Sequence, residues 1–308
     1  MKRTARRVTL FLAIAVVAGF LYSVALRLTA GIPGVARTMV MAAVTFAVLA
    51  ALFASFERIA PEKHAAVRGF RGERVTDICW WLLGYVSRFA AEIGTTVCIV
   101  VVVRMLPNHP VAIINTQPIW LQVIEALLIG DFFQYWIHRF LHKPLLWSIH
   151  AVHHSPEDLN WLSTTRIHPM ETILKGPVEM VPLYFLGFST VATLPLVTIT
   201  LGLYEIFVHA NVGWRFGPLR FVIASPAFHR WHHTAETEGF DKDFAGMFPF
   251  YDLAFGTFYL PDRASTAYGL GNGRQMLGFW EQMANPIRFI RRPQGFSLMP
   301  GEAKLDTI

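Results

Sequence analysis

The chain has 308 residues, of which 54% are hydrophobic and only 16% are charged, and its formal net charge is +6. Soluble domains carry roughly 25% charged residues, so this composition excludes an ordinary soluble protein and indicates a membrane protein. The basic residues lie in short loops between apolar runs, which favours an orienting role and contact with anionic headgroups over nucleic-acid binding.

Four apolar runs are long enough to cross a bilayer, since a spanning helix needs about 20 residues. They cover residues 8–28, 38–56, 78–106 and 119–137. The first run follows a basic start and resembles a signal peptide. It is longer than a typical signal core and a second run follows closely, so we predict a retained anchor.

The loops predict how these spans are oriented, because Lys and Arg concentrate on the cytoplasmic side of a membrane. The N-terminus and the loop after the second span are therefore predicted to be cytoplasmic, and the link at 107–118 to lie outside. The fourth span returns the chain to the cytoplasm at His138. The residues on which this orientation depends are Lys2, Arg3, Arg6, Arg7, Arg58, Lys63, Arg68, Arg71 and Arg74.

The third run contains Arg88 and Glu92, one helical turn apart, and begins with Trp80 and Trp81. Charges inside a membrane are costly and mark functional cavities, which gives one interpretation of the pair. The alternative, which we favour, places residues 77–92 at the interface, with the tryptophans in the headgroup belt.

A further apolar run at 178–208 contains Pro182, Gly187 and Pro195. A single crossing would leave the histidines before and after it on opposite sides of the bilayer. Two full spans need about 40 residues, so the run predicts a shallow or kinked helical hairpin that returns to its own side. Residues 209–308 are then predicted to be cytoplasmic.

Histidine is concentrated in one part of the chain, since ten of the twelve histidines lie between residues 138 and 233. Eight of them form three boxes, HRFLH, HAVHH and HRWHH, and these are His138, His142, His150, His153, His154, His229, His232 and His233. Residues three or four apart share a helix face, so each box is predicted to present its imidazoles in one direction. Neutral imidazole suits iron, zinc, copper and nickel, and eight or more ligands exceed one coordination sphere. The boxes therefore predict two metal ions.

Two acidic residues lie at helical spacing from these histidines. Asp131 is seven residues before His138, and Glu205 is four before His209. An acid at such a place can accept the second N–H of a ligand and fix its tautomer, or can simply be a polar residue of the interface.

Two further histidines are candidate ligands. His168 precedes Pro169, which predicts a short helix that ends at Gly176, and His209 stands at the cytoplasmic exit of the hairpin. Ser225 is predicted to cap the helix that carries HRWHH. The isolated His64 and His109 are predicted to be solvated.

In these segments the sequence resembles the fatty acid hydroxylase and sterol desaturase superfamily, in particular its bacterial sterol desaturase branch. The resemblance covers residues 75–262, through DFFQYWIHRFLH, HAVHHSPEDLNW, RIHPMET, HANVGWRFGPL, ASPAFHRWHH and FAGMFPFYDLAFGTFYLP. It implies an all-α membrane protein with about four transmembrane helices, the membrane-embedded hairpin, and a cytoplasmic helical cap. Residues 1–74 would form a transmembrane hairpin and loop, and 263–308 a cytoplasmic tail.

The resemblance also implies a di-iron centre held by the eight box histidines, with His168 and His209 completing the usual set. Zinc is an alternative occupant in purified protein. One departure is Asp243, where family members often carry Asn.

Two ferrous ions and O2 would oxidise an unactivated C–H bond, giving hydroxylation or desaturation of a lipid such as a sterol or fatty acyl lipid. The substrate is predicted to enter from the bilayer past aromatic residues, which would otherwise form an interfacial belt; these are Trp136, Trp147, Trp161, Trp214 and Trp231. Only Cys79 and Cys98 occur, without a CxxC or HPGG motif, and GLGNG at 269–273 is interpreted as a loop. A separate electron donor, a ferredoxin or cytochrome with its reductase, is therefore implied.

Two other functions compete with this hypothesis. A metal transporter or storage protein would place histidines along a path within the spans, whereas these lie at their ends. A zinc-dependent hydrolase of membrane lipids fits imidazole ligands, but HExxH is absent and water activation does not need so many histidines. The sequence determines neither the lipid nor the oligomeric state.

Overall fold

The computed structural model describes residues 2–32, 34–59, 61–62, 72–105, 112–271, 276 and 278–291. Regular secondary structure in this part of the chain is helical, apart from isolated β-bridges that join Pro61 to Val212 and Thr234 to Tyr268. The predicted all-α class is therefore confirmed. The chain forms two compact units, which are residues 1–63 with 210–213, and residues 64–209 with 214–308. We call the second the histidine unit.

The first unit is a pair of packed helices, α1 (Lys2–Leu28) and α2 (Gly34–Ile59). They contain the first two predicted spans, and their windows Phe11–Leu28 and Ala36–Ile59 are long and apolar enough to cross a membrane. The segment 210–213 is bonded to the end of this pair, where the Asn211 N–H donates to Glu57 Oε1 at 2.8 Å. His64, Lys63, Arg68 and Arg71, on which part of the orientation depends, lie outside the described residues, as does His109.

Four long helices build the histidine unit: α3 (Gly72–Met105), α5 (Ile119–Leu141), α7 (Pro169–Phe185) and α8 (Thr193–His209). A short helix α4 (Ala112–Asn115) precedes α5. The third predicted span, 78–106, coincides with α3 as far as Met105, and the segment Glu73–Met105 meets the length and hydropathy needed for a crossing. α5 covers the fourth predicted span but carries several polar residues, and it is not among the three qualifying helices in the described chain.

The α3 residues expected at the interface divide between two environments. Arg88 and Glu92 are both exposed, so they do not form a buried ion pair. Trp80 is fully buried, and its indole N–H donates to Gln282 Oε1 at 2.5 Å. The placement of Trp80 in the headgroup belt is therefore wrong, because the C-terminal segment covers it.

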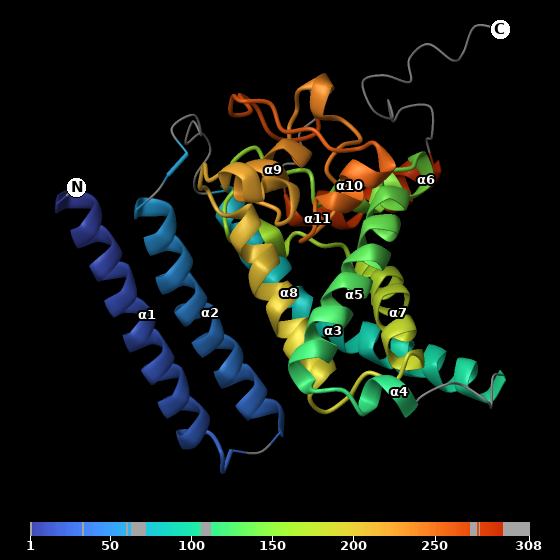
Figure 1. Ribbon diagram of the computed structural model, residues 1–308. Coiled ribbons are helices and arrows are strands. Elements are labelled where there is room, and N and C mark those ends of the chain that lie inside the picture. The colour runs from blue at the N-terminus through green and yellow to red at the C-terminus, as the bar shows by residue number, and fades with distance from the viewer. Residues whose placement is uncertain are drawn as a thin grey trace, which may run out of the picture. The chain divides into compact units, whose positions relative to one another are not determined.

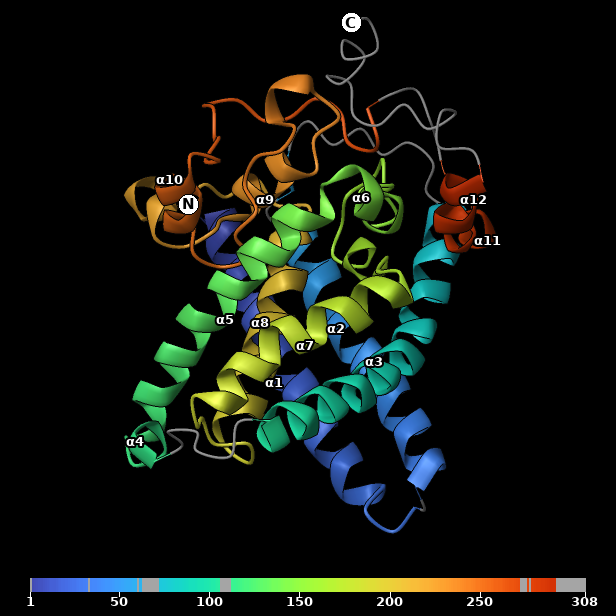
Figure 2. The ribbon, with the colours of Figure 1, turned by 90° about the vertical axis from the view of Figure 1, so that its right-hand side faces the viewer.

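The predicted hairpin is formed by α7 and α8, between which the chain turns at residues 186–192. Gly187 has φ 88°, a left-handed conformation that glycine adopts most readily. α5 packs against both helices, and α3 packs against α7 (Figures 1 and 2). The hairpin brings the chain back to the end at which α7 began.

The predicted end of a helix at Gly176 is wrong, because α7 continues through Gly176, Pro177 and Pro182 to Phe185. A Cβ at residue 176 would lie 3.0 Å from Thr95 Oγ1 and 3.7 Å from Ala91 Cβ. Glycine at this position therefore allows α3 and α7 to approach closely, and their packing outweighs the local stop signals.

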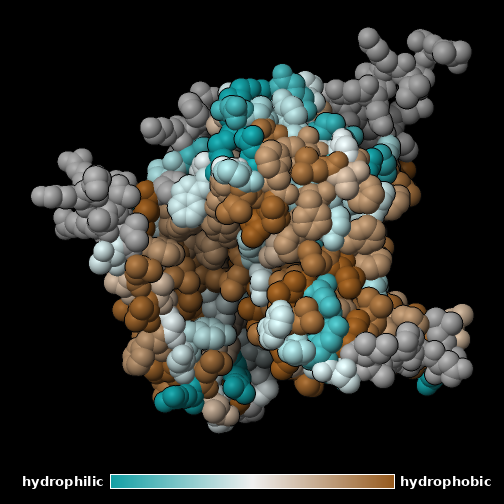
Figure 3. Space-filling view, in the orientation of Figure 1, coloured by the Kyte–Doolittle hydropathy of each residue, from teal (hydrophilic) through white to brown (hydrophobic). Residues whose placement is uncertain are grey.

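Shorter helices cover the end of the unit where α5 and α8 finish (Figure 1). They are α6 (Pro144–His150), α9 (Pro226–His232), α10 (Phe250–Phe255), α11 (Phe279–Met283) and α12 (Asn285–Arg291), with 3-10 turns at Ser163–Thr165, Gly217–Phe221 and Thr237–Gly239. Hydrophilic residues gather at this end, which we call the cap, whereas the helix surfaces away from it are largely hydrophobic (Figure 3).

The C-terminal segment belongs to the same compact unit as the predicted catalytic domain. α11 packs on α3 and α12 on α6, and the Asn285 side-chain amide donates to the Ser148 carbonyl at 2.6 Å. The described part of GLGNG is a loop in which Gly269 and Gly271 have φ 103° and 69°. The division of the sequence at residues 74 and 262 stays a prediction.

Candidate metal centre

Nine buried histidines form two adjacent groups at the base of the cap. In each group the ligand nitrogens lie within 4.8 Å of one another. The first group is His138, His142, His150, His154 and His232; the second is His153, His209, His229 and His233. Every side chain is 5% exposed or less, so both groups are closed to bulk water.

The second and third boxes each serve both groups. His150 and His154 join the first group, but His153 between them joins the second. His229 and His233 join the second group, and His232 joins the first. The expectation that each box points in one direction is therefore wrong: residues four apart share a direction, and the remaining histidine points to the neighbouring group.

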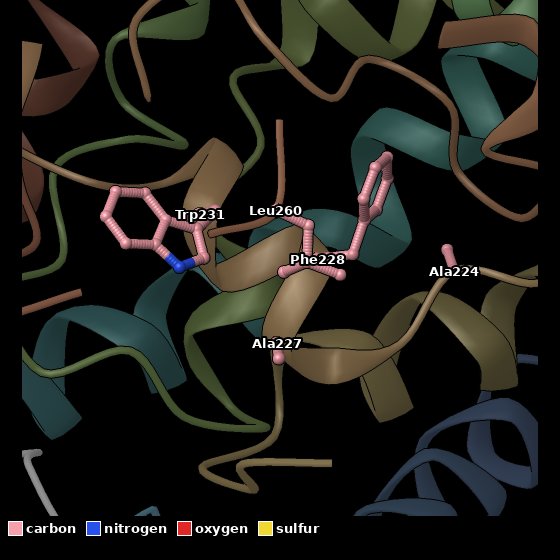
Figure 4. Close-up of a cluster of buried hydrophobic side chains, with 5 residues drawn as sticks. All are labelled: Ala224, Ala227, Phe228, Trp231 and Leu260. Carbon is pink, nitrogen blue, oxygen red and sulfur yellow. The ribbon is translucent and has the colours of Figure 1, made fainter. Parts of the chain in front are cut away.

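The orientation of α9 is fixed by its apolar face, which is buried and leaves the histidines on the opposite face. Ser225 caps this helix by accepting the Phe228 N–H at 3.2 Å, as predicted. Phe228 and Trp231 pack with Ala224, Ala227 and Leu260 in a buried cluster (Figure 4). Burial of those two aromatic rings leaves the third box on the side that faces the other histidines.

Backbone carbonyls fix the tautomers of three imidazoles. Nδ1 of His138 donates to the Phe244 carbonyl at 2.7 Å, and Nδ1 of His232 donates to the Lys242 carbonyl at 2.8 Å. His209 makes the same contact with the Glu205 carbonyl at 2.7 Å. A carbonyl oxygen can only accept, so the proton is on Nδ1 and each Nε2 carries a free lone pair.

The ligand nitrogens of each group converge closely enough to share a cation. His150 Nδ1 lies 3.0 Å from the Glu171 carboxylate, and His138 Nε2 lies 3.1 Å from His150 Nε2. In the second group, His209 Nε2 lies 3.1 Å from Nε2 of both His153 and His229. Nitrogens 3.1 Å apart subtend about 95° at a shared metal if each bond is about 2.1 Å. The donor set and its spacing fit one metal ion in each group.

The pKa shifts of the histidines also indicate that the imidazoles are neutral. Burial lowers the pKa of the histidines in both groups, and for His209 the pKa falls to about 4. The imidazoles are therefore neutral near pH 7, which is the form that binds a metal. Nε2 of His142 and of His232 is buried without a hydrogen-bond partner among the described residues, which leaves both atoms free to bind one.

Comparisons with known proteins identify the family. Residues 123–257, which contain all nine histidines, match the sequence profile described as Fatty acid hydroxylase. The chain is 35% identical to ornithine lipid hydroxylase of Rhizobium tropici over 249 residues, covering 77% of this chain and 72% of that protein. The chain belongs to the fatty acid hydroxylase family. The predicted resemblance is thereby confirmed, and it places the chain among membrane-bound oxidoreductases of lipids.

Other relatives share a shorter segment with this chain. Alkylglycerol monooxygenase of Homo sapiens is 34% identical over 47% of this chain, which spans about a third (32%) of that protein. A very-long-chain aldehyde decarbonylase of Oryza sativa is 29% identical over 41% of this chain and 21% of its own length. No solved structure matches the chain.

Asp131 does not contact a histidine, contrary to prediction. Its carboxylate accepts the N–H groups of Gly246, Met247 and Phe248 at 2.7–3.0 Å. A Cβ on Gly246 would lie 3.0 Å from Asp131 Oδ1, so glycine permits this approach. Asp131 therefore holds the loop that supplies the Lys242 and Phe244 carbonyls.

The sequence analysis expected Glu205 beside His209, but it missed the two acidic side chains that contact imidazoles, Glu171 and Asp241. Glu205 acts on His209 through its backbone carbonyl, and the carboxylate that reaches a ligand is Glu171, which is 1% exposed. Asp241 Oδ1 lies 3.4 Å from His142 Nδ1, and its side chain is 51% exposed. Glu171 lies within the RIHPMET segment of the resemblance, at the start of α7, and that segment is the signal that could have pointed to it.

His168 is not brought into either histidine group. Its Nδ1 accepts the Met170 N–H at 3.2 Å and so caps α7, and its Nε2 lies 3.3 Å from the Met283 carbonyl. Its ring stands beside Trp80, with 6.1 Å between centroids. Both ring nitrogens are engaged, so His168 links α7 to the C-terminal segment and is not positioned as a ligand.

Asp243, the departure noted from the resemblance, has an unusual backbone conformation. Its φ is 61°, in the left-handed region that Asn and Asp tolerate better than most residues. Its carboxyl accepts the Tyr259 N–H at 2.7 Å, and burial raises its pKa well above the ordinary value. Asp243 thus shapes the loop beside Phe244.

One of the five tryptophans proposed to guide substrate lies against the site. The Trp147 ring is 5.1 Å from the rings of both His142 and His154. Trp231 belongs to the core behind α9, and Trp136 packs on Phe255 with 4.9 Å between centroids.

Proposed function

We propose that the protein holds two iron ions in the two histidine groups and uses O2 to hydroxylate or desaturate a membrane lipid. The observation that carries the proposal is the pair of buried groups in which fixed tautomers turn bare Nε2 atoms toward one another. Nine neutral ligands exceed the coordination sphere of one ion and suit a pair of divalent transition metals.

Bound iron would supply the two-electron reduction of O2 and the oxidant for the C–H bond. Hydroxylation balances as lipid C–H, O2, two electrons and two protons giving lipid C–OH and water. The protein's own part is to keep a proton on Nδ1 through the carbonyls of Phe244, Lys242 and Glu205, to place Glu171 against His150, and to exclude bulk water. A separate ferredoxin or cytochrome, with its reductase, would supply the electrons.

The lipid and the orientation in the membrane are part of the proposal. The names of the relatives point to an ornithine lipid in one case and to alkylglycerols in another. They support a lipid substrate whose headgroup differs between family members. The basic loops favour a cytoplasmic N-terminus and a cytoplasmic histidine cap.

Lipid profiling of cells with and without the chain, grown under 18O2, tests this function. We expect a lipid that gains one labelled oxygen or loses two hydrogens only when the chain is present. Purified protein should require iron and O2 for the same conversion. Turnover by zinc-loaded protein without O2 would overturn the proposal in favour of a zinc-dependent lipid hydrolase.

A further inference from the structure

Two segments of the cap expose large apolar side chains. The first covers residues 214–223, and the second covers residues 279–290, which form α11 and most of α12. Leu219 is 61% exposed in the first segment, and Trp280 and Ile290 are 79% and 71% exposed in the second. We call the two segments the apolar rim; its exposed apolar members are Trp214, Leu219, Phe221, Val222, Ile223, Trp280, Ile287 and Ile290.

Other parts of the cap lack such side chains. Residues 224–252 and 256–271, all of which the structure describes, expose no large apolar side chain. Between these two ranges, α10 exposes Leu253 and Phe255. Large exposed apolar patches are rare on surfaces that face water, and they mark contacts with a membrane or with another protein. The apolar rim therefore favours an apolar neighbour, whereas the remainder of residues 224–271 suits water.

The position of the rim points to the membrane surface. α11 packs on the beginning of α3, a helix that is long and apolar enough to span a membrane (Figure 2). There the Phe279 ring lies 5.0 Å from the ring of Trp80, and the same turns of α3 expose Ile78 and Leu82. Residues 214–223 follow closely after the end of α8, the second helix of the apolar hairpin. Both segments thus lie where apolar helices join the cap.

The composition of the rim is also typical of a membrane interface. Tryptophan is enriched at the level of the lipid headgroups, and each segment exposes one, Trp214 or Trp280. Each segment also carries an arginine: the Arg220 guanidinium lies 5.0 Å from the centre of the Phe221 ring, and Arg288 of α12 is exposed. Such side chains keep their charge among headgroups while their stems lie along apolar surface. A lipid surface therefore fits the rim better than a purely apolar protein partner.

We propose that the apolar rim inserts into the headgroup layer of the membrane, so that residues 279–290 are not part of a wholly cytoplasmic tail. This membrane contact does not depend on the metals or on the reaction. The rim is bonded to the histidine unit beside the metal centre, because the Asn285 amide donates at 2.6 Å to the carbonyl of Ser148, two residues before His150. The rim therefore holds the histidine groups close to the membrane surface, where a lipid can reach them from the bilayer.

Spin labels test this placement in full-length, zinc-loaded protein in nanodiscs. Cys79 and Cys98 are first replaced by Ala, and Leu219→Cys and Ile287→Cys then place one label in each segment. We expect each label to collide more often with O2, which concentrates in lipid, than with chromium oxalate, which stays in water. Thr237→Cys, at an exposed turn of the cap, is the matched control and should show the opposite order. A label in either segment that collides more often with chromium oxalate would overturn the inference, and would indicate that a second copy or a protein partner covers the rim.

Tryptophan fluorescence gives a second measurement that needs only a conservative change. The contribution of Trp280 is the difference between the wild-type protein and Trp280→Phe. We expect lipids brominated near the headgroup to remove most of this contribution, and lipids brominated at the chain end to remove little of it. Trp231→Phe, at a buried tryptophan, is the control, and its difference should resist both lipids. Absence of quenching of Trp280 by either lipid, or stronger quenching from the chain end, would contradict insertion at the headgroup level.

Discussion

The two histidine groups differ in the hydrogen-bond partners of their Nδ1 atoms. In the first group, His138 and His232 donate to carbonyls of the loop at 242–244, and His150 contacts Glu171 of α7. In the second group, His209 donates to a carbonyl of its own helix, and Nδ1 of His229 and of His233 has no hydrogen-bond partner among the described residues. The first group therefore depends on long-range packing, whereas the second depends mainly on local helix geometry.

Removal of one ligand from each group is the strongest way to break this comparison. His232→Ala should lose the metal of the first group and His153→Ala that of the second, so each variant retains about one iron per chain and below about 1% of the wild-type rate. Iron content and lipid turnover are measured on the same preparation. The matched control is His168→Ala, a buried histidine outside both groups, which should keep two iron ions. Full activity in either ligand variant would show that the assignment is wrong.

A lower pH should destabilise both histidine groups, because both consist of buried, neutral imidazoles. The ordinary histidine pKa is 6.5, and burial lowers that of His209 to about 4. Between these values the unfolded chain binds protons that the folded chain does not, so the free energy of unfolding decreases as the pH falls through this window. The same protons compete with metal for Nε2. Retained iron and the thermal midpoint, recorded from pH 7 to 4, should both fall; constant values down to pH 4.5 would contradict this account.

Replacement of Glu171 by Gln should weaken metal binding in the first group and leave the second group unchanged. The amide keeps the shape but weakens the contact with His150, so we expect metal affinity to drop about 10- to 100-fold in the first group alone. Competition with a chelator should then release one iron early and the second at the wild-type rate. Equal loss from both groups would mean that Glu171 acts on overall stability.

Asp241→Asn should have the smallest effect. Its carboxylate is 51% exposed and 3.4 Å from His142 Nδ1, so solvent screens the interaction and water can replace it. We expect less than about a threefold change in metal affinity. The same chelator competition measures this change, and a loss as large as that of Glu171→Gln would show that the exposed contact orients His142 after all.

The sequence predicted the features that depend on local geometry. The apolar runs, the return of the chain between α7 and α8, and the Ser225 cap all follow from helical spacing and from well-known helix signals. Eight of the nine grouped histidines were candidates because of their spacing in three boxes, and His209 was a candidate because it stands at the end of the hairpin.

The missed features depend on contacts between distant segments. Asp131 has the right spacing to reach His138, but the loop around Gly246 comes closer and takes its carboxylate. The stop signal at Gly176 is outweighed because α3 packs against that glycine. His168 contacts the Met283 carbonyl. A local sequence pattern cannot predict where a segment more than a hundred residues later will pack.

Anomalous X-ray scattering at the iron edge from active, full-length protein tests the central claim most directly. The account predicts two iron peaks, one among His138, His142, His150, His154 and His232 and the other among His153, His209, His229 and His233. A single peak, or none, in protein that still oxidises its lipid with O2 would contradict it.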